Sequence, residues 1–264
     1  MNFPIILLDV AKQAANPNIW KVFVNFLSSI LEAINTVTGK IPEPFGGYGL
    51  AVILFTIIMR AALLPLDLKS KKSNQKISEI QPLINEINQK YKNDPEKKNK
   101  KTMELYQQHK ANPLGGCLPM LIQLPLMFAM FAALNSISSA AVQSNLVDPF
   151  LWIKNIWQAD SPLKNITGAA IPFFSPGYNG LFILPILAGV TSYYQMKLTT
   201  PKGGNQQMKG FTAMMPLMSV WFCTMYTASF AIYWVTANIF QIAQQIIMVK
   251  LMPPAKDLVK DGGK

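Results

Sequence analysis

The stretch LAVILFTIIMRAALLPL, residues 50–66, is apolar except for Thr56 and one full charge, Arg60. A charge inside a candidate membrane helix costs about 2.5–3.5 kcal/mol on insertion scales and usually marks a functional site. Arg60 lies about 10 Å before Asp67 along a helix, so its side chain reaches only part of the way to water. The candidate spans contain no Asp or Glu. The sequence therefore predicts that no intramembrane acid neutralises Arg60.

Polar side chains in the apolar runs are the candidates to surround this arginine. Thr56 lies one turn earlier on the same helix face. The others are Gln123, Gln195, Thr236, Asn238 and Gln241. They predict either a wet recess open to the cytoplasm or interhelical hydrogen bonds that only hold a bundle together, and the sequence leaves both open. Tyr233 and Trp234, near the start of the last apolar run, favour an anchor at the membrane interface over a substrate contact.

Other chemistry has little support. The chain has no phosphate-binding loop, no dinucleotide fingerprint, no metal-ligand cluster and no nucleophile–base motif. Cys117 and Cys223 lie in apolar runs, which gives no disulfide framework. Ser192 and Ser219 have no His or acid to activate them. We therefore expect a protein that is not an enzyme and that needs no cofactor or metal ion.

The elements that position Arg60 follow from the distribution of charge. Half of the 264 residues are hydrophobic and 14% are charged. No Asp, Glu, Lys or Arg occurs in residues 111–147, 165–196 or 210–249, and a helix needs about 20 apolar residues to cross a bilayer. We predict an all-α polytopic membrane protein. Its five spans lie near residues 48–66, 116–137, 180–198, 211–226 and 230–249, with a tight turn near 227–229 between the last two.

Lysines set the expected orientation, because cytoplasmic loops are enriched in Lys and Arg. Eleven lysines lie in residues 69–110, and more follow the third span and the fifth. Only five lysines lie on the opposite side. The N-terminus is therefore predicted to be extracytoplasmic and the C-terminus cytoplasmic.

Two segments flank the spans. NIWKVFVNFLSSILEAI, residues 18–34, has apolar residues at helical spacing and predicts an amphipathic helix on the outer membrane surface, with packing on the protein's own core as the alternative. The segment after the first span predicts a basic antiparallel helical hairpin, with an apolar stripe through Ile77, Ile80 and Ile84. Pro82 should kink its first helix, and NDPEKK should begin its second. The lysines of this hairpin form a solvated face that could also contact anionic lipid or ribosomal RNA.

The expected division follows these elements. It comprises an extracytoplasmic N-terminal segment with the interfacial helix (1–47), the first span (48–67), the cytoplasmic hairpin (68–113), spans two to five with an extracytoplasmic loop at 138–179 (114–252), and a cytoplasmic tail (253–264).

Several motifs together resemble the YidC/Oxa/Alb family of membrane protein insertases. They are IIMRAALLPL, the Lys-rich hairpin, NPLGGCLPMLIQLPLMFAMFAAL, MMPLM and IYWVTANIFQIAQQ. The resemblance extends from about residue 20 to residue 250 and implies the compact five-span form typical of Gram-positive-type bacteria, in the plasma membrane.

The resemblance implies a function for the buried arginine. In the family, a hydrophilic groove open to the cytoplasm and to lipid receives a nascent hydrophilic tail, while the substrate helix leaves along spans three and five. The groove arginine corresponds to Arg60, its neighbouring threonine to Thr56, the polar position of span three to Gln195, and the aromatic position of span five to Trp234, beside Tyr233. The implied partners are nascent membrane proteins with one span and acidic N-terminal tails, the bilayer, the Sec translocon and the ribosome. A monomer would suffice.

Two other functions stay open from the residues alone. A channel or secondary transporter for an anionic solute would use Arg60 as its binding site, but the chain lacks internal repeats and a coupling-ion acid. An intramembrane enzyme would need an activated nucleophile in the spans. The large basic hairpin favours the insertase.

Overall fold

The computed structural model describes residues 17–109, 111, 118–165, 167–171, 177–199 and 206–251. Every regular element in this part of the chain is an α-helix, apart from isolated β-bridges between residues 150 and 178. The predicted all-α class is therefore confirmed. Three helices within the described residues are long and apolar enough to cross a membrane, at Gly47–Glu79, Gln123–Gln143 and Ala228–Lys250.

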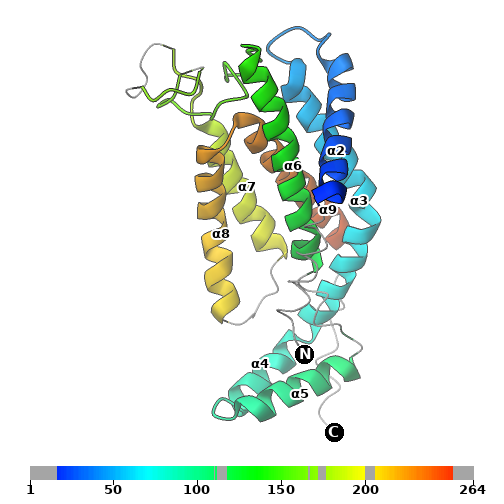
Figure 1. The fold of residues 1–264 in the computed structure, drawn as a ribbon. Coiled ribbons are helices and arrows are strands. Elements are labelled where there is room, and N and C mark those ends of the chain that lie inside the picture. Colours follow the sequence, from blue (N-terminus) through cyan, green and yellow to red (C-terminus); the bar gives the residue numbers. More distant parts are fainter. Residues whose placement is uncertain are drawn as a thin grey trace.

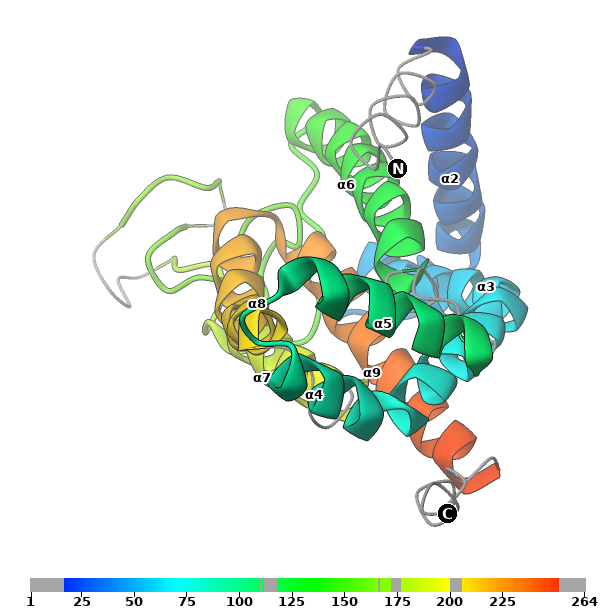
Figure 2. The ribbon, with the colours of Figure 1, turned by 90° about the horizontal axis from the view of Figure 1, so that it is seen from below.

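The helices form one elongated bundle with a hairpin below it (Figure 1). The bundle contains α2 (Pro17–Thr38), α3 (Gly47–Glu79), α6 (Leu118–Gln143), α7 (Ile183–Thr199), α8 (Gln206–Met225) and α9 (Ala228–Leu251). The hairpin contains α4 (Gln81–Lys90) and α5 (Pro95–Gln108). α9 packs against both α3 and α7 and so joins the two halves of the bundle, while α8 packs on α7. Viewed from below, α4 and α5 lie side by side across the end of the bundle (Figure 2).

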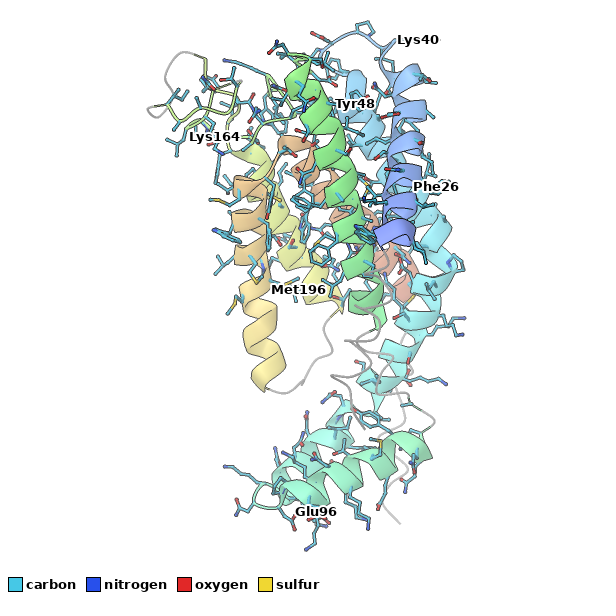
Figure 3. The ribbon with its side chains drawn as sticks, viewed as in Figure 1. Phe26, Lys40, Tyr48, Glu96, Lys164 and Met196 are labelled. Carbon is cyan, nitrogen blue, oxygen red and sulfur yellow. The ribbon has the colours of Figure 1, made fainter. Side chains whose placement is uncertain are left out.

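The two ends of the bundle differ. The described residues of the 144–182 segment, between α6 and α7, lie at one end, which we call the loop end, and α4 and α5 lie at the other, the hairpin end (Figure 1). Figure 3 shows Lys40 and Lys164 at the loop end and Glu96 at the hairpin end.

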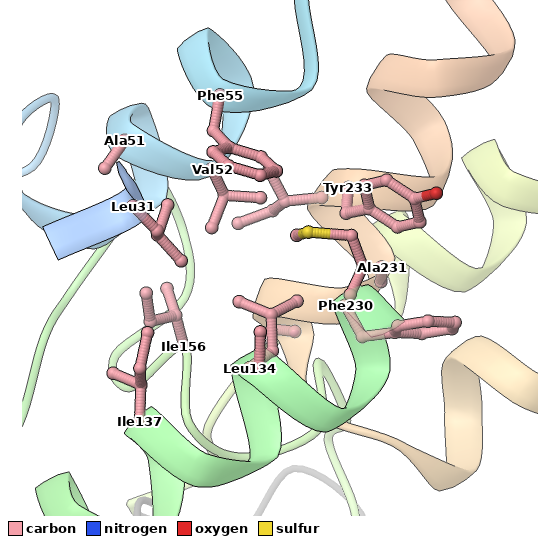
Figure 4. Close-up of a cluster of buried hydrophobic side chains, with 14 of the residues drawn as sticks. Leu31, Ala51, Val52, Phe55, Leu134, Ile137, Ile156, Phe230, Ala231 and Tyr233 are labelled. Atoms are coloured by element: carbon pink, nitrogen blue, oxygen red, sulfur yellow. The ribbon is translucent and has the colours of Figure 1, made fainter. Parts of the chain in front are cut away.

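The hydrophobic core lies toward the loop end, where it joins α2, α3, α6, α9 and the 144–182 segment (Figure 4). Leu31, Phe55 and Ile156 are fully buried, and Trp157 meets Tyr48 edge to face with ring centroids 5.0 Å apart. Burying such side chains stabilises a fold by about 1.5–3 kcal/mol each in water. The loop segment is therefore part of the core rather than a loose connection.

Two carboxylates of this segment hold the beginnings of helices. Asp148 accepts from the backbone N–H of Tyr48 at 3.0 Å, in the first turn of α3. Asp160 is fully buried and accepts from the N–H groups of Phe182 and Leu184 at 3.1 and 2.7 Å, at the start of α7. Each acid satisfies backbone donors that have no partner within their own helix.

The helix on residues 18–34 is present as α2. Leu27 and Leu31 are fully buried against the bundle, and Trp20, Ile30 and Ile34 pack beside them. The structure thus supports the alternative interpretation for this face, packing on the protein's own core. The opposite side of α2 also carries exposed apolar side chains, among them Val22 and Phe26. Contact with the outer membrane surface stays a prediction.

The hairpin departs from the predicted pattern in where its first helix begins. α3 continues unbroken from the first apolar run to Glu79, and Pro82 lies in the first turn of α4. Pro82 therefore begins a helix instead of kinking one, because a proline in the first turn needs no backbone donor. Asp94 caps α5 by accepting from Lys97 N at 3.0 Å, and Ile77, Ile80 and Ile84 form the hairpin's core. Residues 112 and 113, expected to end the second helix, lie outside the described residues.

Candidate functional site

Arg60 lies inside the bundle, just beyond the hydrophobic core on the hairpin side. It is 4% exposed, while Phe55, just over one helical turn nearer the loop end, belongs to the core. Thr56 is also buried, and its hydroxyl donates to its own helix, to Val52 O at 2.6 Å. Thr56 therefore lies one turn from the arginine on α3, and within the described residues its hydroxyl bonds to its own helix rather than to Arg60.

Two glutamine side chains meet the guanidinium. Its Nη2 donates to Gln123 Oε1 on α6 at 2.7 Å. Because a guanidinium has only donors, the amide oxygen of Gln241 on α9 faces it, and accepts from Nη1 at 3.0 Å and from Nη2 at 2.8 Å. The Gln241 nitrogen then faces the Gln195 amide on α7, 2.9 Å away. Gln123 Nε2 in turn donates weakly to Tyr233 Oη at 3.4 Å.

We call Arg60, Gln123, Gln195, Tyr233 and Gln241 the Arg60 cluster. Four helices contribute to it: α3, α6, α7 and α9. The only salt bridges among the described residues lie on the hairpin, at Lys97–Asp94 and Lys101–Glu104. Arg60 Nε makes no hydrogen bond within the described part of the chain. The guanidinium is thus solvated by neutral amides and keeps its full charge in a buried setting.

Trp234 and Asn238, predicted in the same site, instead face a second polar group between α7, α8 and α9. Trp234 Nε1 donates to Ser192 Oγ at 3.2 Å, and Asn238 Nδ2 donates to the same oxygen at 2.9 Å. Ser192 Oγ donates to Ser219 Oγ at 2.8 Å. We call Ser192, Ser219, Trp234 and Asn238 the Ser192 cluster.

The structure thus divides the predicted site residues between two clusters. Residues 233 and 234 are neighbours on α9, but successive helical positions are rotated by about 100° and so face different partners. Tyr233 is 2% exposed and lies within the bundle, so the interface-anchor interpretation is wrong for it. Gln241 touches Arg60 and lies on α9 two turns after Trp234, so the two clusters are neighbours along this helix. Sequence reasoning noted Gln241 only as one polar residue among several, and considered Ser192 and Ser219 only as unactivated nucleophiles.

The described residues include no group of three or more His, Cys, Asp or Glu side chains that could hold a metal ion. The two serines of the Ser192 cluster bond to neutral groups only. Such an arrangement can bind an anion or polar chain at Arg60 and can hold helices together. It offers no activated nucleophile.

This chain is similar to several known proteins. The family model described as 60Kd inner membrane protein matches residues 40–256. The chain is 36% identical over 218 residues to "Membrane protein insertase YidC" of Clostridium tetani, which covers 81% of this chain and 87% of the relative. It is also 36% identical over 226 residues to the protein of that name from Fusobacterium nucleatum, with 86% of this chain and 96% of the relative covered.

A longer relative and a solved structure are matched over part of their length. The Chlorobaculum parvum insertase of the same name is 38% identical over 198 residues, which are 75% of this chain and 32% of the relative. The structure described as "Active YidC insertase crystal structure with the first transmembrane domain resolved" has a TM-score of 0.58 at 23% identity. The match covers 84% of this chain and 45% of that one, and it indicates a shared fold.

Proposed function

This chain belongs to the YidC family of membrane protein insertases, and from that membership we propose that its Arg60 cluster receives the hydrophilic tail of a nascent membrane protein. As a member of the family, it is a multi-pass protein of the bacterial cell membrane that inserts other proteins into the bilayer. The proposals concern how it does so and with which partners.

The observation that carries the proposal is a buried arginine that has amide partners and no ion-pair partner among the described residues. Arg60 cannot lose its proton in a protein, so its charge persists. In surroundings of lower dielectric than water, an acidic residue of an arriving tail is attracted more strongly than in bulk water. Because no acid in the described part of the chain forms a salt bridge with Arg60, that acid can come from the substrate.

We place the Arg60 cluster in a groove that opens toward the hairpin end. The hydrophobic core around Phe55, Ile156 and Trp157 occupies the loop end and supports a closed outer side. Gln195 on α7 and Tyr233 on α9 belong to the groove wall in this proposal, as does Thr56. Trp234 and Asn238, held by Ser192, form the adjoining wall between α7 and α9.

The five-span arrangement with the N-terminus outside and the C-terminus inside is part of the proposal. α7 and α8 are shorter or less apolar than the three candidate spans, but α7 packs against α9 and α8 packs on α7 (Figure 1). The four lysines of α5, together with the lysines near the end of α3, support a cytoplasmic hairpin end. The domain division predicted from the sequence follows from this orientation.

The proposed partners are nascent single-span proteins with acidic tails and the surrounding lipid. The hairpin carries exposed lysines and is the proposed surface for contact with the ribosome, and the Sec translocon is a proposed neighbour. No step requires a second copy, a cofactor or a metal ion.

The decisive experiment is complementation of a bacterium depleted of its own insertase. We would follow insertion of a single-span protein with a short acidic N-terminal tail by protease accessibility. We expect Arg60→Ala and Arg60→Glu to lower insertion at least several-fold, and Arg60→Lys to keep part of it, because lysine retains the charge but lacks the planar fork.

The matched control is Lys72→Ala, which removes an exposed cation from the same helix. Insertion at the wild-type rate by an Arg60→Ala protein that accumulates normally would contradict the electrostatic role while leaving the insertase function in place. Failure of a well-expressed wild-type chain would favour an anion channel or transporter, once host incompatibility is excluded.

A further inference from the structure

A row of alternating charges on α3 continues from Arg60 toward the hairpin end. Arg60, Asp67 and Lys71 lie at positions i, i+7 and i+11 of α3, which stays helical through Pro65. At about 100° per residue, Asp67 and Lys71 lie within about 20° of the Arg60 direction on the helix surface. At 1.5 Å per residue they lie about 10 and about 16 Å further along the axis. One face of α3 therefore carries charges in the order plus, minus, plus.

These charges are set apart from the solvated surface. Lys71 Nζ is buried and makes no hydrogen bond to any described residue, whereas the neighbouring Lys72 is exposed. Asp67 is half-buried and interacts electrostatically with both Arg60 and Lys71, although neither forms a salt bridge with it in the described chain. A lysine near the end of a membrane helix normally extends its ammonium group into water. The buried Nζ of Lys71 departs from that pattern.

The facing helix α9 adds an unsatisfied amide at an intermediate depth. α3 packs against α9, and Gln241 of α9 meets Arg60. Gln244 follows three residues later, about 4.5 Å further toward the hairpin end. It is 6% exposed, and neither atom of its amide has a hydrogen-bond partner in the part of the chain that the structure describes. Buried polar groups are normally hydrogen-bonded. A polar group of a bound tail at this depth would therefore form hydrogen bonds that the Gln244 amide otherwise lacks.

We propose that Asp67 is a specificity-determining residue that lets this insertase accept tails carrying a basic residue, and that Lys71 restores attraction for an acidic residue further along the same tail. This inference rests on the proposed function, because it assumes that tails pass Arg60. The spacing fits an extended chain of about 3.3–3.6 Å per residue. Asp67 would lie opposite a tail residue about three positions from the one at Arg60, and Lys71 about two positions beyond that.

The alternating signs have a physical consequence. A path lined by Arg60 and Lys71 alone would hold acidic tails tightly and repel lysine or arginine. One carboxylate about 10 Å from Arg60 changes the preference between acidic and basic tail residues by roughly ten-fold at an effective dielectric near 20. The change is smaller once salt screens the charges. Asp67 therefore weakens the hold on acidic residues and offers a favourable position to basic ones.

The test uses the full chain in the insertase-depleted strain with three matched substrates. They are single-span proteins whose short N-terminal tails are identical except for one position, which is Asp, Asn or Lys. The measured quantity is the ratio of insertion of the Lys tail to that of the Asp tail, each normalised to the Asn tail. The variants are Asp67→Asn, Asp67→Glu and Lys71→Gln. Glu86→Gln and Lys72→Gln are the controls, since they remove exposed charges elsewhere.

We expect Asp67→Asn to lower the Lys/Asp ratio about five-fold, Lys71→Gln to raise it, and Asp67→Glu and both controls to leave it within about two-fold of wild type. An unchanged ratio in both Asp67→Asn and Lys71→Gln, with the Asn tail still inserted, would overturn this inference and leave the proposed function standing. Absence of insertion of all three tails by the wild-type chain would instead overturn the proposed function. If Asp67→Asn fails to accumulate, the ratio for Lys71→Gln decides: a rise supports the inference and no change overturns it.

Discussion

At the scale of single residues, Ser192 makes three hydrogen bonds with one hydroxyl. It accepts from Trp234 and Asn238 and donates to Ser219. A hydroxyl has one donor and two acceptor positions, so its capacity is fully used. Since Ser192, Ser219 and the two donors lie on α7, α8 and α9, one small side chain ties three helices together.

Replacing Ser192 with Ala should therefore destabilise the protein. It leaves the Trp234 indole N–H without its partner, while Asn238 keeps a second bond to Thr191 Oγ1 at 3.1 Å. We expect a loss of about 1–2 kcal/mol, since a buried donor without a partner costs about 1–3 kcal/mol and bonds between membrane helices are often weaker. The measurement is thermal unfolding of purified protein in detergent, with Ser78→Ala at an exposed position as control. Equal melting temperatures for Ser192→Ala and the control would refute this role.

The chemistry of Arg60 could be predicted from the sequence because a lone charge stands out against an apolar run. Gln123 is among the polar side chains that the sequence predicts around Arg60, and the structure gives that pair a 2.7 Å hydrogen bond. The split between Tyr233 and Trp234 could not be predicted. Adjacent positions on a helix face different neighbours, and the sequence does not say which helix lies on which side of α9.

At the scale of elements, α7 and α8 approach closely because one contact position has no side chain. A Cβ added to Gly189 would lie 2.5 Å from Val220 Cγ2 on α8. The Ser192–Ser219 bond lies nearby, about one turn along α7 from Gly189 and one residue along α8 from Val220. Small residues that let two backbones approach, joined by polar side chains, are the usual contact between membrane helices.

Gly189→Ala should consequently push α8 away from α7 and weaken the Ser192 cluster. We expect a loss of about 1–3 kcal/mol, the usual range for an overpacked contact. Val220→Ala removes the methyl group that the new Cβ would meet, so the double variant should recover at least half of the loss. Thermal unfolding of the two single variants and the double variant gives the coupling energy directly. Strictly additive losses would show that the two positions do not meet.

The existence of the helices could be predicted more reliably than their ends. α3 continues about 12 residues beyond the predicted first span because Lys, Gln and Ser continue a helix in water as Leu and Ile do in lipid. Hydrophobicity ends where the expected bilayer ends, whereas the helix ends at Glu79, just before Pro82. That continuity is what places Asp67 and Lys71 in line with Arg60.

At the scale of the whole molecule, the loop end depends on contacts between distant segments. Asp148 caps α3 from 100 residues away, and Asp160 holds the start of α7. The sequence predicted only an extracytoplasmic loop there, because irregular segments have no periodicity that would indicate their partners. Burial should raise the pKa of the Asp148 carboxyl. Burial disfavours the ionised form of this carboxyl, and the hydrogen bond from the Tyr48 N–H partly offsets that effect.

The arrangement of the ends makes the membrane topology testable with single cysteines. Ala169 lies at the loop end, Glu96 lies on the hairpin, both are exposed, and Lys202 follows α7 in the sequence. In a chain with Cys117→Ser and Cys223→Ala that still supports growth, a membrane-impermeant thiol reagent should label Ala169→Cys in intact spheroplasts. It should label Glu96→Cys and Lys202→Cys only after the membrane is opened.

The third probe, at residue 202, distinguishes five spans from three, because α7 and α8 must both cross for residue 202 to lie with the hairpin. Labelling of Lys202→Cys from outside would leave α3, α6 and α9 as the only spans among the described helices, and labelling of Glu96→Cys from outside would reverse the whole orientation. The hairpin's excess of lysine argues against the second result, since moving that charge outward works against the positive-inside preference.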